Sequence, residues 1–237
     1  MNFIQRITAS QPWKAIFRHP LPHDRRTRAL AITSNLFLHL HPATLRRDSL
    51  RLSFTWCMGG LTFFLFLVEA FTGILLMFYY RPTVQHAYHD MVALRAQVPF
   101  GILRELHRWA AHAMVITVWL HMLRVFLTGS YKPPREFNWI VGVALLLLTM
   151  LLSFTGYLLP WDQLAIWAVT VGTNMANSAP FIGPNLRFFL LGDSSVGENA
   201  LLRFYVLHCA LLPLITTILC AVHFWRVRKD GGISSPL

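Results

Sequence analysis

Five of the eleven histidines lie in or beside long apolar stretches, and four of them form two pairs of similar spacing. The fifth, His112, lies about 140° around a helix from His107, so we expect it to be structural. His107 and His121 stand at positions i and i+14, and His208 and His223 at positions i and i+15. On an α-helix, the i, i+14 spacing leaves two side chains about 40° apart in azimuth and the i, i+15 spacing about 60°, with a rise of roughly 21 Å. Each pair therefore shares one helix face and offers imidazole nitrogens, which are common metal ligands, at two levels.

Two pairs of glycines repeat this interval in other apolar stretches. Gly59 and Gly73 have the i, i+14 spacing, as do Gly142 and Gly156. A lone histidine in an apolar helix is more often a hydrogen-bonded core residue, and glycine often serves ordinary helix packing. The same interval on four segments favours instead two flat ligands stacked in a bundle, each with two axial histidines. The spacing therefore predicts two bis-histidine b-type haems whose porphyrin edges rest against the glycines.

The composition indicates that a membrane protein positions these residues. Of the 237 residues, 55% are hydrophobic and 13% are charged, against about 25% charged in a soluble domain. The 18 Phe and 8 Trp exclude a disordered chain, and the three scattered Cys do not form a disulfide framework. A net charge of +11 is compatible with nucleic-acid binding, but the basic residues separate apolar runs instead of forming one patch. We therefore expect no nucleic-acid partner.

The apolar runs have the lengths of membrane spans. A helix crosses a bilayer with about 20 apolar residues, and four stretches qualify: residues 54–79, 109–127, 137–159 and 204–225. Residues 161–171 and 185–191 are typical of short interfacial helices. The predicted fold is an all-α integral membrane protein, a four-transmembrane-helix haem-binding bundle with interfacial helices. We divide it into an amino-terminal cytoplasmic-side amphipathic segment, residues 1–53, and a four-helix dihaem domain, residues 54–237.

The basic residues predict the orientation of the spans. Fifteen Lys and Arg residues precede the first span, join the second to the third or follow the fourth, and six lie in the other two connections. The positive-inside rule then places both termini on the cytoplasmic, negative side. The second and fourth spans run in the same direction, so His107 faces His208 near the outer surface, and His121 faces His223 near the inner surface.

Four arginines lie near the two predicted haem levels. Haem propionates are anionic and pair with cations. Arg104 and Arg108 flank His107, while Arg124 and Arg135 lie near the inner pair of histidines. Each is either a propionate partner or an ordinary arginine that extends toward the membrane surface.

Five longer motifs are more specific than the spacing. They are FYYRPTV at 78–84, LHRW at 106–109, PREF at 134–137, GYLLPWDQ at 156–163 and SSVG at 194–197. With these motifs the sequence resembles cytochrome b6, the four-helix amino-terminal half of split cytochrome b in quinol-oxidising bc-type complexes. The likeness runs from about residue 54 to the carboxyl terminus, and the i, i+15 step from His208 to His223 is the b6-type spacing.

The resemblance implies a function in electron transfer. Quinol is oxidised near the outer surface, a Rieske iron–sulfur protein takes one electron toward a c-type cytochrome or a similar acceptor, and the outer haem takes the other. That electron reaches quinone near the inner surface, and the cycle translocates protons. A second polypeptide with three spans and a Pro-Glu-Trp-Tyr motif completes the outer pocket, so we expect enzyme activity only from the complex. The resemblance also implies a homodimer in lipid, in a bacterial cytoplasmic or a thylakoid membrane.

Cys57 stands before Met58 and two glycines, where the resemblance implies a cysteine that holds an additional c-type haem through one thioether. The alternative is a buried free thiol, which is common in apolar helices. Arg228 and Lys229 match the basic pair that follows the last ligand in the family, near the inner quinone and the additional haem.

Glu69 departs from the family, which usually has glutamine at this position. A carboxyl group in a membrane span is costly and commonly functional. We expect it to be protonated or hydrogen-bonded near the outer haem, with a catalytic role in proton transfer from quinol. A neutral acid that replaces the hydrogen bonds of glutamine is the alternative.

Two other classes of protein remain in competition. A dihaem membrane anchor of a hydrogenase or formate dehydrogenase would have similar histidines, but not the PWDQ loop or the cysteine before paired glycines. A transporter or scaffold without redox activity would show no visible absorption.

Overall fold

The computed structural model describes residues 3–16, 24–34, 47, 51–97 and 100–233. The predicted amino-terminal segment is therefore only partly described, and its basic residues Arg18 and Arg46 lie outside the described residues. Throughout the described part the chain forms helices and turns, with no strand. This agrees with the predicted all-α fold.

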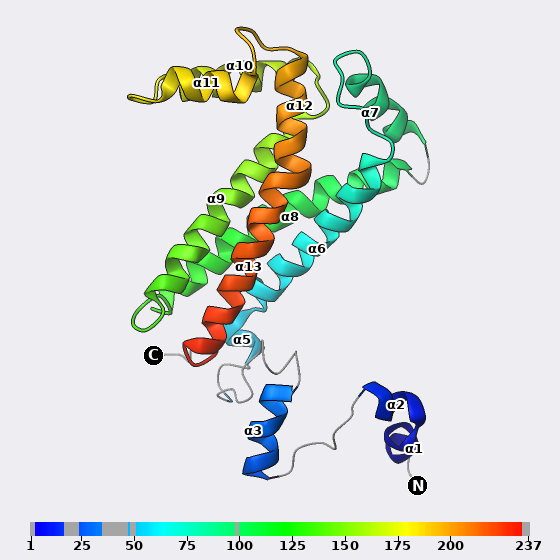
Figure 1. Cartoon of the computed structure of the whole chain (residues 1–237), viewed down its shortest axis with the longest axis vertical. Helices are drawn as coiled ribbons and strands as arrows, with labels where there is room; N and C mark the ends of the chain where they lie inside the picture. Colours follow the sequence, from blue (N-terminus) through cyan, green and yellow to red (C-terminus); the bar gives the residue numbers. More distant parts are fainter. Residues whose placement is uncertain (1–2, 17–23, 35–46, 48–50, 98–99, 234–237) are drawn as a thin grey trace.

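Four long helical segments form the bundle (Figure 1). They are α6 (Met58–Met77), α8 (Phe100–Leu127), α9 (Glu136–Leu158) and a composite of α12 (Glu198–Val206), the π-helix η2 (Leu207–Leu211) and α13 (Leu212–Lys229). Each is long and apolar enough to cross a membrane. The shorter described helices are α1 (Phe3–Ala9), α2 (Gln11–Ile16), α3 (Arg25–Ser34), α5 (Leu52–Thr55), α7 (Ala87–Ala96), α10 (Gln163–Asn177) and α11 (Gly183–Leu191).

The predicted boundaries of three spans need correction. The first span begins at Met58 instead of residue 54, because Trp56 and Cys57 both adopt positive φ of 50° and end α5. The second helix begins at residue 100, before the apolar run that defined the predicted span, because Arg104, Glu105 and Arg108 are good helix formers that shorten the run without ending the helix. The fourth runs from residue 198 to 229.

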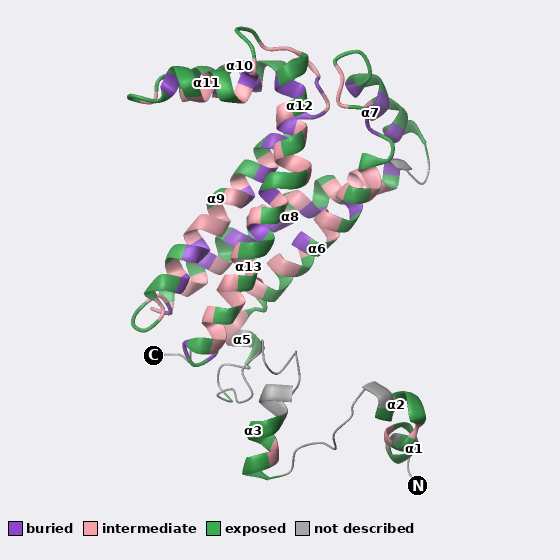
Figure 2. Cartoon of the chain, in the orientation of Figure 1, coloured by how far each residue is buried: buried purple, intermediate pink, exposed green. Residues whose placement is uncertain are grey.

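The bundle consists of two helix pairs. Helix α6 packs on α8, and α9 packs on α13. Many large apolar side chains face outward, among them Phe71, 67% exposed, and Leu127, 71% exposed (Figure 2). Exposed apolar surface of this extent fits a surrounding lipid phase.

A compact core closes one end of the bundle, which we call the outer end. It joins α9, α10, α11 and α12 through fully buried side chains such as Leu158, Val169 and Leu201. The Tyr80 hydroxyl donates to the Leu159 carbonyl at 2.7 Å and ties the end of α6 to α9. The predicted interfacial segments form α10 and α11, whereas α7 in the other outer connection was not predicted.

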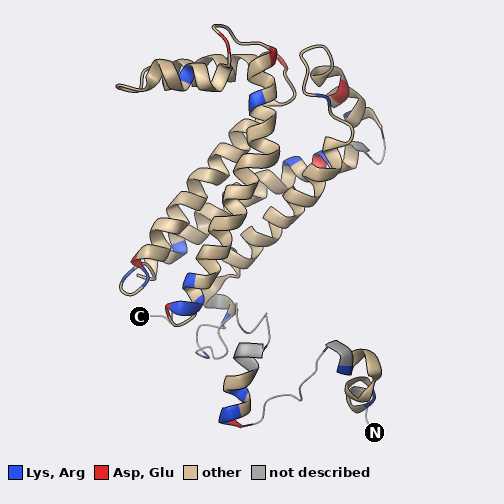
Figure 3. Ribbon diagram, viewed as in Figure 1, with Lys and Arg blue, Asp and Glu red and all other residues tan. Residues whose placement is uncertain are grey.

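The opposite end, which we call the inner end, carries most of the positive charge (Figure 3). The turn between α8 and α9 and the end of α13 lie there, and α3 lies beyond it in Figure 1. Helix α1 is also on this side, as an even number of spans requires.

Candidate haem-binding site

The two predicted histidine pairs face each other between the two helix pairs. The ring centres of His107 and His208 are 6.2 Å apart with an interplanar angle of 80°. Those of His121 and His223 are 6.4 Å apart at 79°. In each pair one ring comes from α8 and the other from the composite helix, η2 for His208 and α13 for His223.

These separations match the space that one metal ion needs between two imidazoles. A metal–imidazole nitrogen bond is about 2 Å long and the nitrogen lies about 1 Å from the ring centre, so two imidazoles on one metal have centres about 6 Å apart. Both pairs meet this requirement. The donor set of two imidazoles per level suits the iron of a bis-histidine haem.

Each predicted glycine lies directly against one of these histidines. A Cβ atom on Gly156 would lie 2.6 Å from His208 Cε1, and one on Gly73 would lie 3.2 Å from His107 Cε1. At the inner level the corresponding distances are 3.1 Å from Gly59 to His121 Cε1 and 3.8 Å from Gly142 to His223 Cε1. The glycines thus let each ring lie close to the backbone of the neighbouring helix. Each ring then faces the histidine opposite it on the other helix pair.

The π-helix explains how the i, i+14 step in α8 and the i, i+15 step in the composite helix produce the same geometry. The Leu212 N–H bonds the Leu207 carbonyl, five residues earlier, so one turn contains an extra residue. His208 lies within this turn. The extra residue compensates for the longer step and brings His208 and His223 level with His107 and His121. Pro213, which has no N–H to donate, follows directly.

Comparison with known proteins agrees with this geometry. Residues 45–231 match the family model cytochrome b/b6/petB. Cytochrome b6 of Heliomicrobium gestii is 44% identical over 187 residues, which cover 78% of this chain and 87% of the relative. Cytochrome b6 of Tupiella akineta is 46% identical over 183 residues, 77% of this chain and 85% of the relative. The chain belongs to the cytochrome b family.

A solved structure titled "Hyperthermophilic respiratory Complex III" has the same fold. Its TM-score is 0.71 at 27% identity, and the alignment covers 90% of this chain and 54% of that chain. Membership of the cytochrome b family, together with four apolar helices, makes this a multi-pass, haem-binding membrane protein.

Polar contacts at the outer level of the cytochrome b bundle include two threonines that sequence reasoning missed. Thr72 Oγ1 lies 2.8 Å from His107 Nδ1, and Thr155 Oγ1 lies 3.2 Å from His208 Nδ1. Each threonine directly precedes a predicted glycine, so the tripeptide Phe-Thr-Gly occurs at 71–73 and again at 154–156. This repeat is a signal in the sequence that would have identified them.

The predicted propionate partners have different surroundings. Arg104 and Arg108 both donate to Glu105, at 3.0 Å from Arg104 Nη1. Arg124 donates from Nε to the Phe54 carbonyl at 3.2 Å, while its buried Nη2 has no partner in the described part of the chain. That free donor at the inner end suits an anionic group. Arg135 precedes α9 and is half-buried.

The inner end holds a group of buried polar atoms that the sequence did not reveal. Asn138 Oδ1, His223 Nδ1 and Asp230 Oδ2 have no hydrogen-bond partner among the described residues. Arg226 contacts Asp230 at 2.7 Å, yet its Nε is also without a partner there. Lys229 lies over the Trp225 ring at 4.9 Å.

Cys57 is exposed at the inner end of α6, so the thiol is not buried within this chain, and a free thiol stays the alternative to a haem attachment. Its positive φ turns the chain between α5 and α6. A Cβ added to Gly60 would have no atom within 4 Å, so there is open space near this turn. The thiol is thus accessible to a bulky partner.

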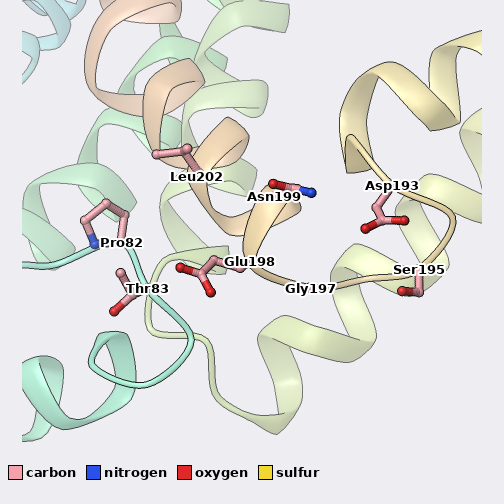
Figure 4. A pocket seen from close by; sticks show the side chains of 8 residues that line it. All are labelled: Pro82, Thr83, Asp193, Ser195, Gly197, Glu198, Asn199 and Leu202. Atoms are coloured by element: carbon pink, nitrogen blue, oxygen red, sulfur yellow. The ribbon is translucent and has the colours of Figure 1, made fainter.

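A separate cavity of about 450 Å³ opens at the outer end (Figure 4). The loop after α6, with Pro82 and Thr83, forms one side, and the start of α12 and the segment before it form the other. Asp193 and Glu198 make its lining acidic. No residue predicted for haem binding lines it.

Proposed function

We propose that this chain is the dihaem cytochrome b subunit of a quinol-oxidising complex of the bc or b6f type, and that it passes electrons across the membrane. The observation that carries the proposal is the matched geometry of the two histidine pairs, 6.2 Å and 6.4 Å apart at nearly the same angle. When bound, each haem supplies a reversible one-electron couple. The protein holds the two haems in series and excludes water and ions from the path between them.

The histidines hold the two b-type haems, His107 with His208 at the outer level and His121 with His223 at the inner level. The glycines behind them leave room for the rings. Arg104 and Arg108 are the cations near the outer propionates, and Arg124 and Arg135 those near the inner ones. The free Nη2 of Arg124 supports this assignment most directly.

We further propose that Cys57 carries a covalently attached c-type haem at the inner end. The exposure of the thiol supports this. A denaturing gel stained for haem should show colour on this chain, lost in Cys57→Ser and retained in the matched control Cys209→Ser. A colourless wild-type band would contradict the attachment.

The remaining sites belong to the assembled complex. A quinol site at the outer end requires a three-helix second polypeptide and a Rieske iron–sulfur protein, with a c-type cytochrome as the next acceptor. Quinone is reduced at the inner end, near Arg228 and Lys229, and turnover translocates protons. The assembly is a homodimer in a bacterial cytoplasmic or a thylakoid membrane, with residues 1–53 and both termini on the negative side.

Glu69 lies at the outer level, 3.1 Å from His107 Nδ1. This distance supports the expectation that the Glu69 carboxyl group is hydrogen-bonded near the outer haem. Proton transfer from quinol remains the second proposal for this carboxyl group. Unchanged quinol turnover in Glu69→Gln would exclude proton transfer.

Haem content tests the main proposal. Dithionite-reduced minus oxidised spectra of the isolated complex should show two b-type haems. His107→Ala and His121→Ala should each lose one of the two. The matched control is His112→Ala, because His112 lies on the same helix and packs against Trp109 at 5.7 Å. Full haem content in both ligand variants would refute the assignment.

A further inference from the structure

The Nδ1 atom of His107 has two oxygen neighbours on α6. Glu69 Oε2 lies at 3.1 Å and Thr72 Oγ1 at 2.8 Å. The Thr72 hydroxyl donates to the Val68 carbonyl at 2.6 Å, so it presents a lone pair to the histidine. The Glu69 side chain is only 12% exposed, and its other oxygen, Oε1, is buried with no partner among the described residues.

This arrangement selects one tautomer of the ring. The nitrogen that binds iron must present its lone pair, so the other nitrogen carries the hydrogen. With Nδ1 facing two acceptors, the hydrogen belongs on Nδ1 and Nε2 is the nitrogen left for iron. A second group that accepts this hydrogen orients the ligand ring and raises its basicity.

The other ligands with described contacts lack such a carboxyl group. His208 Nδ1 lies 3.1 Å from the Leu152 carbonyl and 3.2 Å from Thr155 Oγ1, which are both neutral acceptors. His223 Nδ1 has no partner in the described part of the chain. Among these three ligands only His107 meets an acidic side chain.

We propose that Glu69 is a positioning residue that lowers the reduction potential of the outer haem, by accepting the Nδ1 hydrogen of His107. The more basic imidazole stabilises ferric over ferrous iron, so the outer haem holds an electron less tightly and passes it on more readily. This inference rests on the proposed function, because it requires His107 to bind iron.

Redox titration of the purified complex carrying Glu69→Gln tests the proposal. The amide is nearly the same size but is a weaker hydrogen-bond acceptor than a carboxylate, so the midpoint potential of the outer haem should rise. A change of about tenfold in the ratio of ferric to ferrous stability corresponds to about 59 mV for one electron. The low-spin ferric EPR g values of the outer haem should shift with it, while the inner haem serves as the internal control.

Two further variants complete the test. Thr155→Val removes a neutral acceptor beside the opposite ligand and should shift the potential less. Glu69→Asp withdraws the carboxyl by one methylene, should give an intermediate shift, and provides the measurement if Glu69→Gln fails to assemble. The inference is overturned if Glu69→Gln binds haem with an unchanged midpoint potential at the outer haem, or if that potential rises without any change in the g values. It is also overturned if Thr155→Val raises the outer potential by the same amount. Absence of b-type haem from the wild-type complex would refute the proposed function instead.

Discussion

At the scale of single residues, the bundle depends on glycines, which place backbone without a side chain beside the histidine rings. Gly156 is the tightest position, because a Cβ there would lie 2.6 Å from His208 Cε1, closer than real contacts allow. Gly156→Ala should therefore displace the ring and lose the outer haem, halving the b-haem content in a reduced-minus-oxidised spectrum. Gly60→Ala is the matched control, since its Cβ would meet no atom within 4 Å. Equal haem content in the two variants would show that the glycines serve another purpose.

An ion pair at the outer end provides a pH-dependent prediction. Arg81 binds Asp90 through its backbone N–H, Nε and Nη2, and these hydrogen bonds hold the pKa of Asp90 below its usual range. A lowered pKa means that the pair stabilises the fold fully above the ordinary carboxyl pKa of about 3.9, and that this contribution is lost as the pH falls through the lowered value. In thermal unfolding, the wild type should have a higher midpoint temperature than Asp90→Asn at pH 7. This difference in midpoint temperature should disappear below pH about 4. A difference that persists at acid pH would contradict it.

Side-chain types and intervals were sufficient to predict which histidines face each other, because helix geometry converts an interval directly into a shared face. The glycines were expected against porphyrin edges, whereas they lie against the histidine rings. Contacts made by a side chain with a partner on another element were harder to predict. The bond from Arg124 to the Phe54 carbonyl depends on how α5 lies beside α8, and the approach of Thr72 to His107 depends on how α6 packs against α8. Neither follows from spacing alone.

At the scale of elements, hydropathy found the four spans but not their irregular turns. The break at Trp56 and Cys57 lies within an apolar run, and the nearby glycines, Gly59 and Gly60, fall inside the first turn of α6 instead of marking the end of α5. Helix α7 is short and mixed in polarity, so it carries little periodic signal. The π-helix did have a signal in the sequence, since an i, i+15 step opposite an i, i+14 step requires one extra residue in a turn.

Deleting Ala210 tests whether that extra residue only corrects the register. The deletion shortens the step from His208 to His223 to i, i+14. A regular α-helix would then place these two histidines level with His107 and His121 on α8. We expect both haems to be retained in spectra of the isolated complex. Deleting Leu147, which lies between Gly142 and Gly156 on the regular helix α9, should rotate one glycine by about 100° away from its histidine and lose a haem. Loss of haem in the Ala210 deletion would show that the π-helix itself orients His208.

At the scale of the whole molecule, charge and chemistry divide between the two ends of the bundle. The outer end has a packed core, an acidic cavity and a histidine, His107, in contact with the Glu69 carboxyl group. The inner end has most of the basic residues, the exposed Cys57 and the unpaired polar atoms near His223. The molecule is thus polarised along the direction in which we propose that electrons move, and its function depends on which end faces the cytoplasm.

Accessible cysteines test this orientation directly. Lys132 is exposed in the turn between α8 and α9 at the inner end, and Ser195 is exposed in the last outer connection. Because basic residues are retained on the negative side of the membrane, a membrane-impermeant maleimide applied to intact cells should label Ser195→Cys and leave Lys132→Cys at the background of wild type. After the membrane is opened with detergent both variants should react, which controls for local reactivity. Labelling of Lys132→Cys but not Ser195→Cys in intact cells would reverse the topology, and with it the proposed sides of quinol oxidation and quinone reduction.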